Sequence, residues 1–369
     1  MREPLDAILA AFDATAPLDE AWTIPGSWYV DPRIEALERA TVWSRTWQLV
    51  ARTDQLREAG QYVTAEVAGE PIVVVRGSDG VLRAFFNVCR HHAAAVMTEP
   101  CGTADRLRCP YHGWTYDLAG TLRGVPEAQG MRGFDKDRMG LVPVAVDTWE
   151  HFVFVHLDRD PVPLRAQLGA VVDQVAPLGL GTLQFCERRV YELACNWKVF
   201  VDNYLDGGYH VPHLHEGLAS ILSHADYTIE CFDRCCLQRS PIATTGGDAI
   251  TASVRKGEAL YYWIYPNLML NWYEGYLDTN LVIPLGIDRV RVIFDFYFDD
   301  ISAARAERNR QSMDVSERIQ DEDHAICESV QRGLASRAYG AGRLSVRREA
   351  GERLFHQLLA RDLRSGLHA

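Results

Sequence analysis

Residues 87–114, NVCRHHAAAVMTEPCGTADRLRCPYHGW, carry the most specific signal in the chain. Cys89 and His91 have the spacing C-x-H, Cys109 and His112 have the spacing C-x₂-H, and 17 residues separate the two pairs. Two thiolates and two imidazoles can bind zinc tetrahedrally, or a [2Fe–2S] cluster in which the cysteines hold one iron and the histidines the other. Zinc fingers commonly keep two cysteines together, whereas each pair here mixes one cysteine with one histidine. The spacing therefore favours the iron–sulfur cluster over zinc.

The same stretch resembles the cluster-binding motif of Rieske proteins, and CPYHGWTYDLAG (109–120) matches their second loop. The resemblance implies that one iron is held by Cys89 and Cys109 and the other by His91 and His112. This chain has His92 and Ala93 where the family usually has Arg-Gly. We expect His92 not to be a ligand.

A second group of chemically active residues lies in NWKVFVDNYLDGGYHVPHLHEG (196–217), which holds three histidines and two aspartates within 14 residues. On a helix, Asp202, Asp206 and His210 would share one stripe, because positions i, i+4 and i+8 align. The pair Gly207-Gly208 and the following proline interrupt that helix, and such irregularity suits a binding site better than a core helix. Two histidines and a carboxylate form the facial triad of non-haem Fe(II) oxygenases.

This segment resembles the catalytic domain of Rieske ring-hydroxylating and demethylating oxygenases. The resemblance implies that His210 and His215 bind a mononuclear iron and that His213 is not a ligand but either contacts the ligands or packs beside them. The family's third ligand is a carboxylate in a late helix, and SERIQDEDHAICESVQRGL (316–334) is the matching stretch. We assign Asp323 as this ligand, with Asp321 as the alternative.

The resemblance also implies a carboxylate that links the two metal sites. In the family it accepts hydrogen bonds from a cluster histidine of one subunit and an iron-ligand histidine of the neighbouring subunit, and such partners orient imidazoles. Its usual position, three residues before the first ligand histidine, is Gly207 here. We therefore expect Asp206 to be the bridge, with Asp202 as the alternative.

The composition limits the other classes of function. The 369 residues are 47% hydrophobic and 24% charged, which is typical of a globular protein with two domains. A net charge of −12 argues against nucleic acid as a partner. There is no apolar run long enough for a membrane helix, and the N-terminus is a poor signal peptide. Nine cysteines without a repeated spacing favour a reducing cytoplasm.

The pattern along the chain predicts an α+β protein. Residues 1–42 are expected to pack with the catalytic domain, residues 43–158 to form an all-β Rieske domain, and residues 159–369 to form a catalytic domain with an antiparallel sheet and covering helices. Strands are predicted at QYVTAEV, PIVVVRG, VLRAFFNV, HFVFVHL, RRVYELAC, YYWIYPNLMLNWY, TNLVIPL and RVRVIFDFYF. The resemblance implies a helix-grip (START-like) catalytic domain and a head-to-tail homotrimer.

We interpret the chain as the oxygenase component of a multicomponent monooxygenase or dioxygenase that hydroxylates or dealkylates a small organic substrate. Its catalytic half resembles choline monooxygenases and related quaternary-ammonium oxygenases, and aromatic residues in 261–276 could hold a fixed positive charge. The individual substrate contacts are not assigned. The alternatives are hydroxylation or demethylation of an aromatic compound, and a Rieske protein that only transfers electrons. Because the chain has no nucleotide-binding glycine motif and no ferredoxin spacing, a separate reductase, with or without a ferredoxin, must supply electrons from NAD(P)H.

Overall fold

The computed structural model describes residues 3–242 and 249–368 and divides the chain into two compact units. One unit is Arg39–Gln167, for which the sequence predicted 43–158. The other unit combines the N-terminal segment, up to Glu38, with the chain from Leu168 onward. No helix among the described residues is long and apolar enough to cross a membrane.

The Arg39–Gln167 unit is built from antiparallel strands. A seven-stranded sheet has the order β1-β10-β9-β4-β3-β2-β5, and a small sheet has the order β6-β7-β8. The strands are β1 (Gln48–Arg52), β2 (Gln61–Val67), β3 (Glu70–Arg76), β4 (Leu82–Phe86), β5 (Cys101–Thr103), β6 (Leu107–Arg108), β7 (Thr115–Tyr116), β8 (Leu122–Gly124), β9 (Pro143–Trp149) and β10 (Phe152–His156). The short helical segments are η1 (Arg39–Trp43, a π-helix), η2 (Thr53–Leu56), η3 (Lys136–Met139) and α4 (Leu164–Leu168), the last of which ends at the boundary of the unit.

Alternation along β3 separates two hydrophobic cores in this unit. Ile72 and Val74 point into one core, and Val73 and Val75 point into the other. Successive side chains of a strand face opposite sides, so a continuous apolar run indicates a strand buried on both faces. The core that contains Val73 also contains the two cysteines of the predicted cluster motif.

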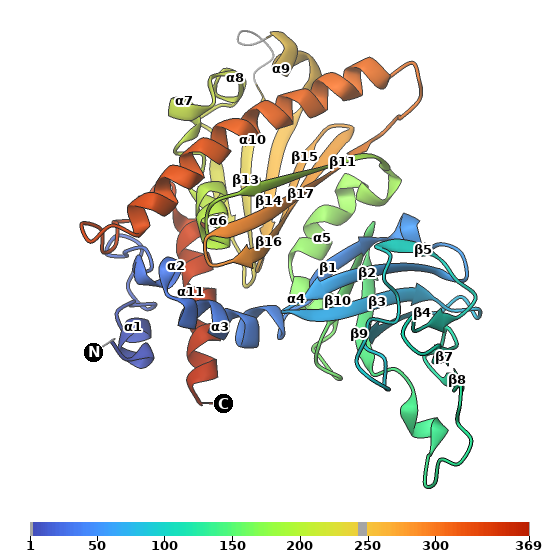
Figure 1. Ribbon diagram of the computed structural model, residues 1–369. Coiled ribbons are helices and arrows are strands. Elements are labelled where there is room, and N and C mark those ends of the chain that lie inside the picture. Colours follow the sequence, from blue (N-terminus) through green and yellow to red (C-terminus); the bar gives the residue numbers. More distant parts are fainter. Residues whose placement is uncertain (1–2, 243–248, 369) are drawn as a thin grey trace. The chain divides into compact units, whose positions relative to one another are not determined.

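The second unit has a seven-stranded antiparallel sheet in the order β11-β17-β16-β15-β14-β13-β12, and the long helix α10 lies across it (Figure 1). The strands are β11 (Gln184–Leu193), β12 (Thr228–Cys231), β13 (Cys235–Pro241), β14 (Glu258–Ile264), β15 (Leu268–Tyr273), β16 (Tyr276–Gly286) and β17 (Arg289–Phe298). The helices are α1 (Leu5–Ala10), α2 (Ser27–Val30), α3 (Pro32–Glu38), α5 (Val171–Val175), α6 (Trp197–Leu205), α7 (Val211–Leu214), α8 (Glu216–Ala219), α9 (Ala249–Val254), α10 (Ala306–Leu334) and α11 (Ala350–Ser365), with short 3₁₀ turns η4 (Ala176–Leu178), η5 (Leu180–Thr182) and η6 (Gly366–His368). The α+β class with antiparallel sheets, predicted from the sequence, is confirmed.

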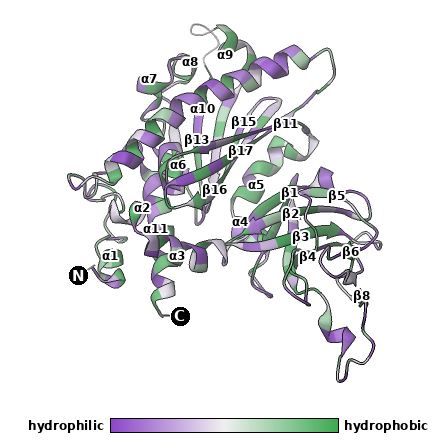
Figure 2. Cartoon of the chain, viewed as in Figure 1, coloured by the Kyte–Doolittle hydropathy of each residue, from purple (hydrophilic) through white to green (hydrophobic). Residues whose placement is uncertain are grey.

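The coloured cartoon agrees with this layering. In Figure 2 the strands of both sheets carry bands of hydrophobic residues, whereas hydrophilic residues predominate along α10. Where the sequence predicted strand through YYWIYPNLMLNWY, the structure forms a hairpin of β14 and β15 that turns at Pro266. Proline lacks the amide hydrogen that a continuous strand would need in the middle of a sheet. The helix that the sequence predicted to be interrupted at Gly207-Gly208 is divided into α6, α7 and α8.

A buried ion pair connects the N-terminal segment to the catalytic unit. Helix α6 begins after Asn196, whose side chain accepts a hydrogen bond from the Lys198 amide at 3.0 Å, as an N-cap residue does. The Lys198 ammonium lies 2.5 Å from a carboxylate oxygen of Glu38, and both side chains are 1% exposed. The other oxygen of Glu38 accepts a hydrogen bond from the Trp197 indole at 2.9 Å. Both charges are therefore compensated inside the unit.

We predict that Lys198→Met destabilises the protein by about 3–5 kcal/mol, because it leaves the Glu38 carboxylate buried without its counter-charge. The double variant Lys198→Met/Glu38→Gln should recover part of this loss. Urea denaturation followed by circular dichroism measures both. A matched control is Glu307→Gln, which removes an exposed ion pair with Arg310 and should hardly move the midpoint. Equal midpoints for Lys198→Met and the control would contradict the prediction.

Candidate functional site

Two similar turns carry the four residues of the predicted cluster motif. The Ala93 amide donates to the Cys89 carbonyl at 3.0 Å, and the Gly113 amide donates to the Cys109 carbonyl at 3.1 Å. Ala93 (φ +61°) and Gly113 (φ +73°) both lie in the left-handed region. Glycine adopts this conformation without strain, and alanine does not. This chain therefore has an alanine, Ala93, at a position where the turn favours glycine.

The turns bring the four predicted ligand side chains together. Cys89 and Cys109 are each 2% exposed. The ring centroids of His91 and His112 are 4.7 Å apart, and His91 stacks on Trp114 with ring centroids 4.8 Å apart and planes 4° apart. His92 is also close, with its ring centroid 4.1 Å from that of His91.

The chemistry of this group fits a [2Fe–2S] cluster. The Nδ1 atom of His91 is buried and has no hydrogen-bond partner among the described residues, so its lone pair is available to a metal. Burial lowers the pKa of His91, and the neighbouring His92 and His112 act in the same direction, which favours the neutral imidazole that metals bind. The Tyr116 hydroxyl lies 3.5 Å from the Cys89 sulfur and would remain beside the cluster.

A break in the backbone forms the second predicted site. Helix α6 ends at Leu205, Asp206 is its C-cap, and the next two glycines both have φ +67°. A Cβ atom on Gly207 would lie 2.1 Å from the Arg348 carbonyl oxygen. No side chain can therefore occupy the position where the family usually has its bridging carboxylate. The chain then re-enters a helix at α7, with Pro212 in its first turn.

Three side chains of the second site converge on one point. The Nε2 atoms of His210 and His215 are 3.0 Å apart. An Asp323 carboxylate oxygen lies 3.1 Å from Nε2 of His215 and 3.8 Å from Nε2 of His210. Asn203 holds the same carboxylate oxygen with a hydrogen bond of 2.8 Å. The predicted set is thus brought together from two segments that lie more than 100 residues apart in the sequence.

The protonation pattern of the two imidazoles explains why this cluster needs a cation. Nδ1 of His210 contacts Asp206 at 2.6 Å, and Nδ1 of His215 contacts Glu322 at 2.5 Å. A carboxylate accepts a hydrogen at Nδ1, which leaves Nε2 of a neutral imidazole as an acceptor. With both imidazoles neutral, two acceptor nitrogens and the Asp323 carboxylate point at one another, and either a metal cation or a proton on Nε2 of His215 compensates them. This donor set fits Fe(II), which binds two histidines and one carboxylate.

Burial lowers the pKa of His215, but its hydrogen bonds with Asp323 and Glu322 outweigh this and raise the pKa overall. The same negative surroundings attract a metal cation. Glu322, which lies inside the acidic run QDED, was not predicted from the sequence. Metal-binding histidines commonly contact a carboxylate through their second nitrogen, and an acidic residue next to a predicted ligand could have been proposed for this reason.

The remaining predicted residues have other environments. Asp321 and His213 are exposed. Asp202 accepts a hydrogen bond from the Tyr29 hydroxyl at 2.5 Å and contacts Nε2 of His356 at 3.0 Å. Asp202 and two buried residues of α11, Glu352 and His356, form a separate cluster. Burial and the charge of Asp202 raise the pKa of Glu352 well above its usual value.

A cavity of about 120 Å³ opens onto the second site. Aromatic residues form much of its wall, namely Phe200, Tyr204, Tyr227, Tyr261, Tyr273 and Phe294. Of the aromatic residues in 261–276, Tyr261 and Tyr273 line the cavity, and their hydroxyls are 2.7 Å apart. Trp263 and Tyr265 are instead buried in the unit without lining it. The polar lining includes Gln238, Arg255, Asn271, Asp278, Asn280, Ser316 and Gln320, none of which the sequence analysis had assigned.

Two family models match the chain. Residues 46–138 match the Rieske [2Fe–2S] domain, and residues 180–365 match the catalytic domain of the ring-hydroxylating alpha subunit. The zinc alternative for the first site is therefore wrong. The alternative of a Rieske protein that only transfers electrons is also wrong, because the catalytic domain is present.

Relatives extend along almost the whole chain. It is 37% identical to a chloroplastic choline monooxygenase of Arabidopsis thaliana over 98% of this chain and 87% of that protein. It is 32% identical to the carnitine monooxygenase oxygenase subunit of Escherichia coli, over 92% of this chain and 94% of that protein. A solved quaternary ammonium Rieske monooxygenase superposes with a TM-score of 0.85 at 28% identity, covering 98% of this chain and 99% of that chain.

A naphthalene 1,2-dioxygenase from Rhodococcus shares the fold, with a TM-score of 0.77 at 20% identity over 92% of this chain and 94% of that chain. The domain matches, the full-length relatives and the two histidine-containing sites agree with one another. The chain belongs to the Rieske-type ring-hydroxylating oxygenases, as an O₂-dependent oxygenase subunit with a [2Fe–2S] cluster and a mononuclear iron.

Proposed function

We propose that this subunit hydroxylates or dealkylates a small quaternary ammonium compound. The observation that carries the proposal is the cavity of aromatic side chains that opens onto His210, His215 and Asp323. Aromatic faces attract a fixed positive charge that cannot donate hydrogen bonds. The identity with choline and carnitine monooxygenases over nearly the full chain supports the same class of substrate.

The proposed reaction consumes one O₂, two electrons and two protons for each substrate and releases one water. The product is an alcohol, or a dealkylated amine and an aldehyde if the hydroxylated carbon bears the nitrogen. We assign Cys89, Cys109, His91 and His112 as cluster ligands and His210, His215 and Asp323 as iron ligands. When bound, the cluster supplies single electrons, and the mononuclear iron supplies open positions for O₂ beside the substrate.

The side chains around these ligands position them. Asp206 and Glu322 hold the two imidazoles through Nδ1, and Asn203 holds the carboxylate of Asp323. The aromatic wall surrounds the ammonium group and excludes water from the reacting carbon. This arrangement keeps three acceptor atoms in place before a metal or a substrate arrives.

As a Rieske oxygenase subunit, the protein works in a multicomponent system with a reductase. We propose further that it is a cytoplasmic homotrimer that receives electrons from NAD(P)H through the reductase, with or without a ferredoxin. Within the trimer, electrons would pass from the cluster of one subunit to Asp206 and His210 of the next. The position of Asp206, 2.6 Å from His210, supports it over Asp202, whose carboxylate contacts Tyr29 and His356.

Substrate-dependent O₂ uptake tests the proposed substrate class directly. The protein, with both metal sites filled and a compatible reductase, should oxidise methylated ammonium compounds, and mass spectrometry should detect the hydroxylated or dealkylated product. Turnover of aromatic acids, with no turnover of any ammonium compound, would contradict the proposal and favour the aromatic alternative.

We predict that His112→Ala loses the visible absorption and the electron paramagnetic resonance signal of the Rieske cluster while the fold is retained. The imidazole is a proposed ligand, whereas the surrounding strands have their own buried cores. His92→Ala is the matched control and should retain the cluster signals, although its ring lies 5.5 Å from that of His112. Unchanged spectra in His112→Ala would rule out the cluster assignment.

We predict that Asp323→Ala loses one iron per chain and all oxygenase activity but retains the [2Fe–2S] spectrum. Asp323 supplies the only carboxylate oxygen in the three-residue group described above, and its removal leaves two neutral imidazoles. Metal analysis, with two irons expected in place of three, measures the effect. Asp321→Ala should keep three irons, because this residue is exposed on the same helix. The reverse result would show that Asp321 is the ligand.

We predict that Asp206→Asn keeps both metal sites filled but lowers activity by orders of magnitude. The substitution removes the charge that accepts the Nδ1 hydrogen of His210, while no ligand atom is touched. Rapid mixing should show normal reduction of the cluster by the reductase and slow electron transfer to the mononuclear iron. Near-normal turnover would contradict the role of Asp206. Partial recovery in mixed trimers of Asp206→Asn and His112→Ala chains would support the path between subunits.

A further inference from the structure

Two residues of the cavity wall each have a buried donor without an acceptor. The Nε–H of Arg255 and the Nε2 amide group of Gln320 are buried and have no hydrogen-bond partner among the described residues. Arg255 is 2% exposed, Gln320 is 1% exposed, and both side chains line the cavity. A buried donor without an acceptor costs free energy, so such a pair indicates a group that arrives with the ligand.

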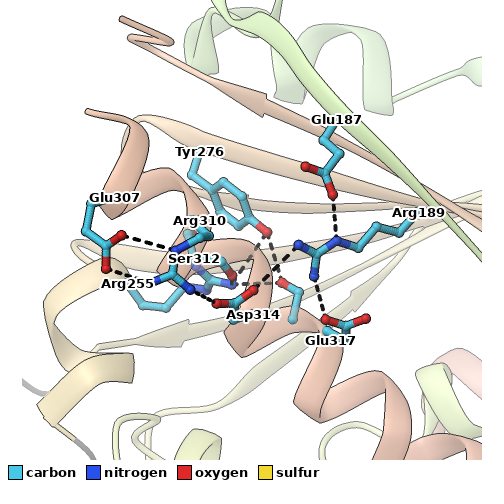
Figure 3. Close-up of polar contacts among 10 residues, drawn as sticks. Glu187, Arg189, Arg255, Tyr276, Glu307, Arg310, Ser312, Asp314 and Glu317 are labelled. Carbon is cyan, nitrogen blue, oxygen red and sulfur yellow. Dashed lines mark hydrogen bonds and ion pairs between the residues drawn. The ribbon is translucent and has the colours of Figure 1, made fainter. Parts of the chain in front are cut away.

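The charge of Arg255 also has no direct carboxylate partner within the described part of the chain. Its guanidinium donates to neutral oxygens, namely the Ser312 hydroxyl and carbonyl and the hydroxyls of Ser316 and Tyr276 (Figure 3). It lies over the rings of Tyr273 and Tyr276, with its central carbon 4.7 and 4.3 Å from their centroids. These contacts fix the guanidinium but leave its positive charge without a contacting anion.

The carboxylate in the same wall is, by contrast, already satisfied. Asp278 accepts hydrogen bonds from Asn271 at 2.5 Å, from Tyr276 at 2.5 Å and from Ser316 at 2.9 Å. This carboxylate therefore does not need a donor from the ligand. A wall with free donors and a satisfied carboxylate is complementary to a group that only accepts hydrogen bonds, and a carboxylate is such a group.

The spacing along α10 separates this part of the wall from the iron site. Gln320 precedes Asp323 by three residues, and Ser316, which contacts Arg255, precedes it by seven. At a rise of about 1.5 Å per residue, these positions lie roughly 5 and 10 Å along the helix from the iron ligand. One end of a ligand can therefore meet the donors while its other end meets the iron ligands.

We propose that Arg255 and Gln320 bind the carboxylate of a zwitterionic substrate, an ammonium carboxylate with several bonds between its two charges. The inference rests on the proposed function, because the ammonium end must lie among the aromatic side chains beside the iron. An uncharged alcohol in place of the carboxylate would leave the guanidinium without a contacting anion. The site thus discriminates against ammonium alcohols.

The test compares γ-butyrobetaine with its methyl ester, which has the same ammonium group and chain but no negative charge. Isothermal titration of the metal-loaded protein without O₂ gives both dissociation constants, and O₂ uptake gives kcat/KM for both compounds. The zwitterion should bind about ten- to a hundredfold more tightly than the ester, as expected for hydrogen bonds to a charged group. Equal binding and turnover of the two compounds would overturn this inference while the proposed function stands.

Two variants assign the preference to the two donors. Gln320→Leu and Arg255→Met should each reduce the preference for the zwitterion by about tenfold and leave the affinity for the ester nearly unchanged. Gln311→Leu is the matched control, because it removes an exposed glutamine contact with Glu307 on the same helix and should not change the preference. Iron content and the cluster spectrum should remain as in the unmodified protein.

The outcomes separate the two proposals. Equal losses of affinity for both compounds would show that the two residues only support the fold, and would overturn the inference. If Arg255→Met fails to fold, Gln320→Leu alone decides, since that amide makes no hydrogen bond through its Nε2 atom that the structure describes. If no ammonium compound of either charge type binds or is oxidised, both the proposed function and this inference fail.

Discussion

The catalytic unit depends on holding three acceptor atoms close together before a metal arrives. Nε2 of His210, Nε2 of His215 and a carboxylate oxygen of Asp323 all lie within 4.8 Å of one another. Such an arrangement is unfavourable because the lone pairs of the three atoms repel one another. Asp206 and Glu322 hold the two imidazoles in place by contacting their Nδ1 atoms. A cation then stabilises all three acceptors at once, so the folded unit favours metal binding.

The backbone next to His210 and His215 also helps to hold the three acceptor atoms close together. Two residues with left-handed backbone end α6 and redirect the chain, so that His210 and His215 approach one point from a short loop rather than from one helix face. Only glycine fits at Gly207, since a Cβ atom would clash with the Arg348 carbonyl oxygen. The carboxylate that contacts Nδ1 of the first histidine belongs to Asp206, the C-cap of the helix, one position before this glycine.

The cavity wall has one part suited to a cation and another part suited to an anion. Its aromatic wall offers negative π faces to a cation, whereas Arg255 and Gln320 offer buried hydrogens to an anion. The satisfied carboxylate of Asp278 keeps the guanidinium network in place without competing for the ligand. A substrate with two opposite charges would satisfy both ends, and its orientation would then determine which carbon lies beside the iron.

Residue spacing was enough to predict the class of chemistry. Metal ligands within one loop have short, fixed spacings, so Cys89-x-His91 and the two histidines of the second site could be proposed as ligands without a structure. Apolar runs bounded by turn residues located about half of the strands that the structure describes. Which carboxylate contacts which imidazole nitrogen depends on the tertiary structure. Adjacent residues on a helix point about 100° apart, so Glu322 and Asp323 contact opposite sides of one imidazole, and no spacing in the acidic run shows this. The free donors of the cavity come from separate elements, and only the folded chain brings them to one wall and leaves them without acceptors.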